Sequence, residues 1–182
     1  MESALHTFSD ASEIGYGMCS YLRHVKVKGD IHVALVLAKS RVAPLKLITI
    51  PRLELAAAAL GSKIRAMLKE ELMIEGLKEK FWVDSKIVLG YILNEKRRYK
   101  TYVANRVQKI LSVTEKKQWD YIDTKENPAD YCSRGISPND TSKVEKWFKG
   151  PSFLWQEKES GLEKRTSLNT PQTTKKLKRI RK

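Results

Sequence analysis

Three segments near the N-terminus have the hydropathy pattern of β-strands. Residues 5–8, 16–27 and 31–38 are rich in apolar, β-branched and aromatic side chains, and residues 28–30 (KGD) are a turn signal between the last two. Neighbouring strands joined by short turns form hairpins. This part of the chain is therefore predicted to fold as an antiparallel meander of three strands.

The pattern becomes helical at Pro51. The segment that follows is rich in Ala, Leu, Lys and Glu, and its apolar positions recur at helical spacing. Proline suits the first turn of a helix because the N–H that it lacks has no helical partner there. The face predicted to be buried consists of Leu53, Ala57, Leu60, Ile64 and Leu68.

The second half of the chain alternates between strand and helix patterns. Strands are predicted at residues 80–83 and 118–122, and helices at 85–93, 101–111 and from 127 to near Gly135. This order predicts an α/β fold: a mixed five-stranded sheet flanked by helices, with three antiparallel strands and then parallel additions that need helical crossovers. The apolar set of the helix predicted at 85–93 is Ile87, Val88, Tyr91 and Ile92. The aromatic residues predicted to be core or core-edge anchors are Trp82, Trp119, Trp147 and Trp155.

Composition adds a strong positive charge to this picture. The chain of 182 residues has a net charge of +14 and is 41% hydrophobic, so it can build a core and favours a polyanionic partner. Residues 156–182 lose apolar periodicity and carry +6 of that charge. We therefore expect a folded domain over residues 1–155 and a basic, disordered tail over 156–182. Its last residues, KKLKRIRK, fit a nuclear-localisation or nucleic-acid-binding patch, or a truncation scar without a role.

Several other classes of protein are disfavoured. No apolar run approaches the roughly 18 residues of a membrane span, and the N-terminus lacks the build of a signal peptide. Cys19 and Cys132 are far apart and belong to no CxxC or Cys/His cluster, so neither a zinc site nor a disulfide framework is indicated. We expect reduced thiols and a cytoplasmic or nuclear location, without secretion or membrane insertion.

Four acidic residues stand where the predicted elements begin or end. Asp10 ends the first strand, Asp84 ends the fourth, Glu54 lies in the predicted first turn of the long helix and Asp130 in that of the last helix. If the first and fourth strands are neighbours, Asp10 and Asp84 meet at one edge of the sheet. Clustered carboxylates repel one another, and divalent cations relieve that repulsion. Two magnesium ions held by such acids support phosphodiester hydrolysis.

Each acid also has an ordinary structural explanation. Asp10 fits a turn or cap, Glu54 and Asp130 fit favourable charges at helix N-termini, and Asp84 fits an N-cap for the next helix. Ser85 is expected to be a capping hydroxyl rather than a nucleophile, because no histidine is available as its base. The joint occurrence of the four acids favours the catalytic interpretation.

Four motifs in order resemble a known family. The segments FSDAS, ITIPRLEL, FWVDS and ENPADYCSRG are similar to the ribonuclease H domain that follows the reverse transcriptase in BEL/Pao-type LTR retrotransposons. The resemblance implies a ribonuclease H-like fold and cleavage of the RNA strand of RNA·DNA hybrids with two Mg²⁺ ions, for which Mn²⁺ can substitute. By motif, it implies that Asp10, Glu54, Asp84 and Asp130 are the catalytic, metal-binding carboxylates. It also implies the reverse transcriptase polymerase domain as a partner.

The chain departs from cellular and retroviral relatives in one respect. They carry a histidine in the loop before the last acid, where this chain has residues 125–127 (KEN). A catalytically weak or decayed nucleic-acid-binding module from a retroelement is therefore the alternative hypothesis, and the chain resembles a fragment of a polyprotein. A solvated helix junction is the ordinary explanation of the basic cluster near residue 98. The candidate nucleic-acid-binding residues are Lys96, Arg97, Arg98, Lys100, Asn105 and Arg106.

Overall fold

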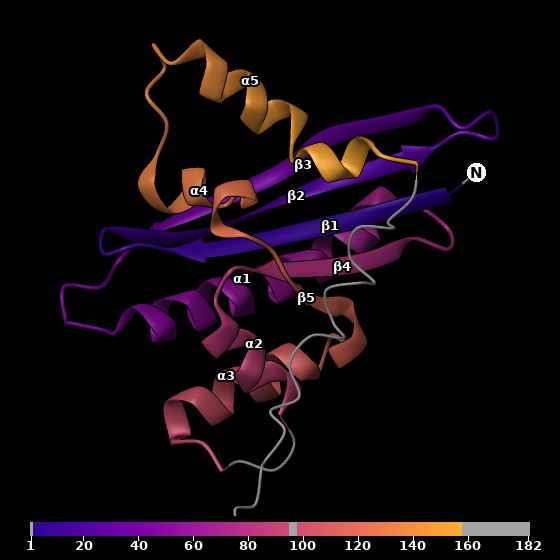
Figure 1. The fold of residues 1–182 in the computed structure, drawn as a ribbon. Coiled ribbons are helices and arrows are strands. Elements are labelled where there is room, and N and C mark those ends of the chain that lie inside the picture. The colour runs from indigo at the N-terminus through magenta and orange to yellow at the C-terminus, as the bar shows by residue number, and fades with distance from the viewer. Residues whose placement is uncertain (1, 95–97, 158–182) are drawn as a thin grey trace, which may run out of the picture.

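A five-stranded mixed sheet forms the centre of the computed structural model, which describes residues 2–94 and 98–157. Its strands are β1 (Glu2–Ala11), β2 (Gly15–Val25), β3 (Ile31–Val42), β4 (Lys78–Val83) and β5 (Trp119–Tyr121), in the order β3-β2-β1-β4-β5 (Figure 1). The first three pair antiparallel, while β4 is parallel to β1 and β5 is parallel to β4. The predicted meander and the parallel additions are confirmed.

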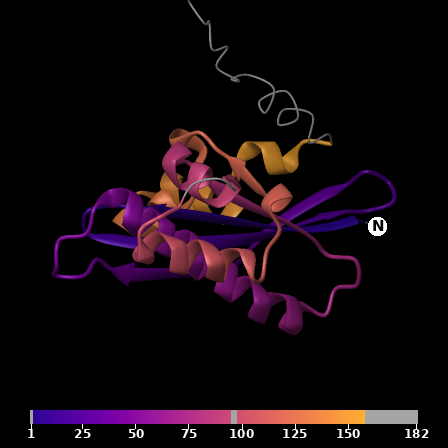
Figure 2. The same cartoon turned by 90° about the horizontal axis from the view of Figure 1, so that it is seen from below.

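Helices cover both faces of this sheet. The helices are α1 (Ile50–Leu72), α2 (Lys86–Leu93), α3 (Thr101–Leu111), α4 (Asp130–Arg134) and α5 (Thr141–Lys149). The views from the front and from below place α1 and α3 on one face and α4 and α5 on the other (Figures 1 and 2). Short 3₁₀ turns precede β5 and α4, and another follows α5.

The core has a layer on each side of the sheet. Phe8, Tyr21 and Trp82 pack on the α4 side, whereas Phe81 and Trp119 pack on the side of α2 and α3. This division follows from the alternation of side chains along a strand, which sends neighbours such as Phe81 and Trp82 to opposite faces. The five residues predicted to form the inner face of α1 are all buried.

A buried ion pair joins α1 to the sheet. The guanidinium of Arg65 on α1 donates two hydrogen bonds to the carboxylate of Glu79 on β4, and both side chains are largely buried. Such a bidentate pair fixes the rotation and position of α1 as well as contributing electrostatic energy. The N-terminal end of α1, which carries Glu54, is thereby held in register with the strands.

Some predicted details are wrong. Ile87 of the predicted apolar set is 53% exposed, and Trp155 is 41% exposed rather than a core anchor, because each lies on the outward side of a short helical segment. Helix α1 begins at Ile50, so Glu54 lies just beyond the first turn, which contains no acidic residue. Helix α5 was not predicted.

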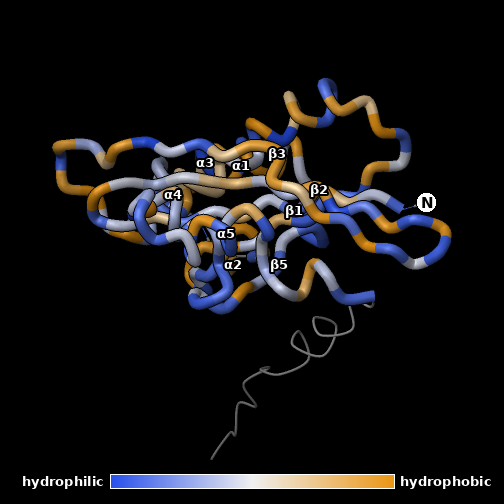
Figure 3. Tube along the Cα trace, turned by 90° about the horizontal axis from the view of Figure 1, so that it is seen from above, coloured by the Kyte–Doolittle hydropathy of each residue, from blue (hydrophilic) through white to orange (hydrophobic). Residues whose placement is uncertain are grey.

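Hydropathy along the chain shows one exposed apolar segment. The loop between β3 and α1 projects from the sheet and carries hydrophobic positions (Figure 3), and Val42, Leu45 and Leu47 are each at least 85% exposed. Within the described residues, no helix combines the length and apolar character that a bilayer span requires.

Candidate active site

The ends of β1 and β4 bring two of the predicted acids to one edge of the sheet. The two strands run parallel, with Ser9 opposite Val83, and the next residues along the chain are Asp10 and Asp84. The predicted pairing of the first and fourth strands is therefore confirmed. Because parallel strands end at the same side of a sheet, both carboxylates are presented at that edge.

The other two acids reach the same edge from helices. Asp130 is the first residue of α4, and Glu54 lies one turn into α1. The negative charges of Asp84 and Asp130 both raise the pKa of Asp10, and the charge of Asp84 raises the pKa of Glu54. The fold thus brings four acids from four elements within electrostatic reach of one another. We call this set the acid edge.

Burial perturbs Asp10 most clearly. This residue is 6% exposed, and burial, opposed by a hydrogen bond from Ser133 and reinforced by the neighbouring acids, raises its pKa from 3.8 to about 6. The Ser133 hydroxyl donates to Asp10 Oδ2. In these surroundings the ionised carboxylate is poorly stabilised, because burial removes water from it and the neighbouring acids repel its charge.

Glu54 and Asp84 are perturbed in the same direction. Burial is the main cause of the raised pKa of each, and hydrogen bonds oppose it, from Ser85 for Glu54 and from Asn127 and Thr124 for Asp84. The fourth acid, Asp130, has a basic partner: Arg134 Nε donates to its Oδ1 over 2.6 Å.

The donor set fits a hard divalent cation in its chemistry. Mg²⁺ prefers carboxylate oxygens, and its charge would stabilise the ionised forms that burial and the neighbouring acids disfavour. Within residues 2–94 and 98–157, however, no three His, Cys, Asp or Glu side chains converge closely enough to hold a metal ion as they stand. Asp10 and Asp130 are instead turned to Ser133 and Arg134.

Residues around the acids support them, and sequence reasoning missed this role. Asn127 is buried, donates from Nδ2 to the Ser9 carbonyl at 3.2 Å and accepts from the Ala129 amide at 3.1 Å. Ser12 Oγ donates to the Ser133 carbonyl at 2.7 Å, which joins the β1–β2 turn to α4. An Asn placed just before a Pro and a short helix is a recognisable turn signal, whereas nothing in the sequence indicated the contacts of the two serines.

The ordinary explanation of Asp84 as a helix cap is wrong. Ser85 is the N-cap of α2, and its hydroxyl accepts from the Val88 amide at 3.4 Å, as the sequence suggested for this serine. Asp84 is therefore free of a capping role.

The two cysteines meet although they are far apart in sequence. Both are free and buried, and Cys132 on α4 packs over β2, where its Sγ lies 3.4 Å from the Met18 carbonyl oxygen. Burial raises the pKa of the Cys19 thiol well above its ordinary value. Both therefore behave as packed thiols that join α4 to the sheet.

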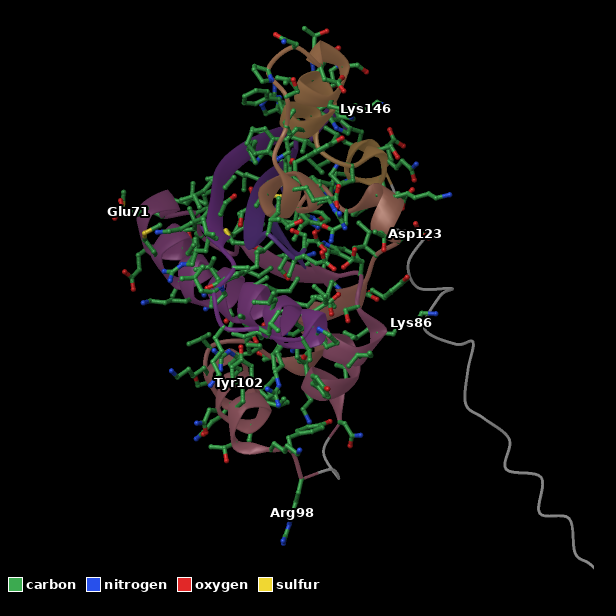
Figure 4. All side chains as sticks on the ribbon, turned by 90° about the vertical axis from the view of Figure 1, so that its left-hand side faces the viewer. Glu71, Lys86, Arg98, Tyr102, Asp123 and Lys146 are labelled. Carbon is green, nitrogen blue, oxygen red and sulfur yellow. The ribbon has the colours of Figure 1, made fainter. Side chains whose placement is uncertain are left out.

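The predicted nucleic-acid-binding residues divide into three groups. Lys96 and Arg97 lie outside the described residues. Arg98 and Lys100 are exposed, and the side chain of Arg98 points away from the rest of the molecule (Figure 4). Asn105 and Arg106 line a groove on the α1–α3 face.

That groove is basic and has a volume of about 360 Å³. We call it the α1–α3 groove. Arg106 stacks on the ring of Tyr102, 3.5 Å from its centroid, which holds the guanidinium in place. Three further basic residues that the sequence did not single out complete the lining: Arg41, Lys63 and Lys109.

Comparison with known families agrees with the resemblance seen in the sequence. Residues 1–85 match the family model described as Pao retrotransposon-like RNaseH-like domain. This match covers just under half of the chain. The matched residues include β1 to β4 and three of the four acids, while Asp130 follows beyond the matched segment. No curated protein matches the chain.

Solved ribonucleases H are similar to this chain at low sequence identity and with TM-scores below 0.5. The N-terminal RNase H domain of a Mycobacterium tuberculosis protein is 7% identical, with a TM-score of 0.46, covering 80% of this chain and 95% of that one. LC11-RNase H1, isolated from compost and solved in complex with RNA/DNA hybrid, is 12% identical, with a TM-score of 0.47 and coverages of 72% and 93%. RNase H1 from the archaeon Halobacterium salinarum is 8% identical, with a TM-score of 0.45 and coverages of 80% and 99%.

Proposed function

We propose that this chain is a metal-dependent endonuclease that hydrolyses the RNA strand of RNA·DNA hybrids, as the RNase H part of a retrotransposon reverse transcriptase. The observation that carries the proposal is the acid edge: four carboxylates from β1, α1, β4 and α4, of which Asp10, Glu54 and Asp84 have raised pKa values. The family match over residues 1–85 and the basic α1–α3 groove support it.

In this proposal the side chains of the site have three roles: binding metal ions, positioning the acids and contacting phosphates. Asp10, Glu54, Asp84 and Asp130 would hold divalent cations, with magnesium expected and manganese able to substitute. When bound, these ions supply charge neutralisation and activation of the attacking water. Ser133 orients the carboxylate of Asp10, and Asn127 fixes the loop between β5 and α4 to the end of β1. The basic residues of the α1–α3 groove contact phosphates and position the duplex without reading its sequence.

A second candidate function is a nucleic-acid-binding module without strong catalysis. Two observations favour it: Asp130 is ion-paired with Arg134, and no three acids converge on one point among the residues that the structure describes. Under this hypothesis the basic α1–α3 groove is the functional surface, and the acids are a remnant of a former active site.

Hydrolysis of a fluorescent RNA·DNA hybrid separates the two functions. The substrate is incubated with the full chain in Mg²⁺, in Mn²⁺ and in a chelator, beside single-stranded RNA, duplex RNA and the Asp84→Asn variant. The nuclease proposal expects cutting of the hybrid alone, which disappears with the chelator and with Asp84→Asn. Binding of the hybrid without cutting in either metal would support the binding module instead.

The polymerase domain of a reverse transcriptase is the proposed partner of this chain. If the isolated chain binds the hybrid weakly, supplying that domain in the same polypeptide is expected to lower the KM for the hybrid more than it raises kcat, because it holds the substrate in place. An unchanged KM in the joined protein would argue against the partnership.

A further inference from the structure

A second groove opens on the other face of the sheet, between the loop before α4 and helix α5. It has a volume of about 840 Å³, and we call it the α4–α5 groove. One wall is the segment from Thr124 to Pro128 together with Asp130 and Tyr131, and the other is α5 with the residues from Gly150 to Trp155. Because Asp130 belongs to the acid edge and also lines this groove, the groove is continuous with the acid edge.

The walls of this groove carry positive charge. Lys143, Lys146 and Lys149 recur every three residues along α5, and all three line the groove. Lys125 lies on the facing wall and is exposed. Figure 4, which looks onto the acid edge, shows Lys146 on one side of the sheet and Tyr102 of α3 on the other.

These lysines are available to a ligand. Lys143 pairs with Asp140 at 2.9 Å and Lys149 with Glu145 at 2.6 Å, and the lysine side chains of both pairs are more than half exposed. Exposed pairs of this kind contribute little net energy, so a phosphate displaces the carboxylate easily.

An aromatic side chain is held at the rim of the groove. Trp155 is 41% exposed, and its indole Nε1 donates to the Lys149 carbonyl at 2.9 Å, which fixes the orientation of the ring. A fixed, exposed indole beside lysines is a platform on which a nucleic-acid base stacks. Tyr131 offers a second, half-buried ring in the same groove.

We propose that the α4–α5 groove binds the phosphodiester backbone of the RNA strand next to the cut, with Lys125 and Lys146 contacting phosphates and Trp155 stacking on a base. This inference rests on the proposed function, because it takes the acid edge as the place of cutting. The α1–α3 groove then holds the DNA strand on the opposite face. The acids lie between the two grooves, so a duplex that crosses the edge contacts both.

The test measures binding in chains that cannot cut. The affinity of Asp84→Asn for the hybrid and for single-stranded RNA is compared with that of the same chain carrying Lys125→Ala and Lys146→Ala. The control carries Lys28→Ala and Lys69→Ala, which remove the same charge at the β2–β3 turn and the far end of α1, away from the acid edge. Trp155→Ala and Trp155→Phe complete the set.

The groove variant is expected to bind the hybrid at least about fivefold more weakly than the control. The slope of log affinity against log salt should fall by between about 1 and 2, since each lost phosphate contact is worth roughly 0.7 to 0.9. Trp155→Ala should weaken binding of single-stranded RNA by at least about fivefold, and Trp155→Phe should restore most of it.

Equal affinities and salt slopes in the groove and control variants would overturn the inference. The outcome is independent of catalysis. A wild-type chain that binds through this groove but never cuts refutes the nuclease proposal and leaves the groove assignment standing. If the wild-type chain cuts the hybrid but the groove and control variants bind it equally well, the groove assignment is refuted and the nuclease proposal stands. Weaker binding of the hybrid with unchanged binding of single-stranded RNA would reassign the groove to the DNA strand and also refute the inference.

Discussion

Replacing Asp10 with asparagine is expected to stabilise the metal-free chain near neutral pH. Burial and the neighbouring charges raise the pKa of this carboxyl from 3.8 to about 6. The folded chain therefore holds this proton more tightly than the unfolded chain does, and ionisation of Asp10 above pH 6 costs folding free energy. An asparagine has no charge to bury, and its amide keeps an oxygen that accepts the bond from Ser133.

The pKa of Asp10 sets the size of this effect. Each tenfold change in proton affinity is worth 1.36 kcal/mol, so the rise from 3.8 to about 6 costs the folded chain about 3 kcal/mol once both states are ionised. The sign follows from linkage: between pH 4 and 6 the native state binds more protons, so the stability from this group is full below pH 4 and falls until pH 6. Asn at position 10 does not titrate, so this loss of stability with rising pH is absent from the variant.

Unfolding by urea in the presence of a chelator, at pH 4.5 and pH 7.5, measures the difference between the two chains. His6 does not confuse the comparison, because burial lowers its pKa to about 3 in both. We expect Asp10→Asn to gain about 2 kcal/mol relative to wild type on going from the lower to the higher pH, because at pH 4.5 the unfolded chain is already largely ionised at this position and about 1 of the 3 kcal/mol has been lost. A gain that is the same at both pH values, or a loss at pH 7.5, would refute the account of a strained carboxylate at the acid edge.

Three further changes test other parts of the structure. Gly17→Ala places a Cβ 2.7 Å from the Cys132 side chain. It should lower the free energy of unfolding in urea by about 1–3 kcal/mol and reduce hybrid cleavage, because it displaces α4. Gly90→Ala, which has open space around the added Cβ, is the control and should leave stability unchanged or raise it. Glu79→Gln leaves the buried guanidinium of Arg65 without its charged partner and should lower the free energy of unfolding by about 3 kcal/mol; a loss below 1 kcal/mol would contradict the pairing. Mg²⁺ at a hundred times its Kd should stabilise the wild-type chain by about 2.7 kcal/mol at pH 7.5. It should stabilise the Asp10→Asn variant by less. If Mg²⁺ raised the thermal unfolding temperature of both chains equally, that result would contradict a metal site at the acid edge.

The elements of the fold were predictable because the hydrophobic pattern determines them locally. The apolar and β-branched segments at 16–27 and 31–38 pair as the antiparallel strands β2 and β3, and the helical period from Leu53 to Leu68 survives as the buried face of α1. The neighbouring positions of Asp10 and Asp84 followed from one condition, that the first and fourth strands pair, and this condition holds: α1 leads from β3 to β4, which lies parallel to β1.

Contacts between distant segments were not predictable from the sequence. Ser133 and Asp10 are 123 residues apart, and their hydrogen bond depends on how α4 lies across β1 and β2. The exposure of Trp155 was not predictable for a similar reason. The residue lies at the surface in the turn that follows α5, but a large aromatic side chain at this point in the sequence resembles a core anchor. Short segments such as α5 carry too few periods for the pattern to mark the buried face.

Hybrid cleavage by four single variants, Asp10→Asn, Glu54→Gln, Asp84→Asn and Asp130→Asn, tests most directly that the acids act as one site. Glu13→Gln is the matched control, because Glu13 is an exposed acid on the turn that follows β1. The account predicts that each of the four loses at least about a hundredfold in kcat, that Asp10→Asn with Asp84→Asn is little worse than either alone, and that the control keeps full activity. Cleavage that survives any two of these substitutions together would contradict it.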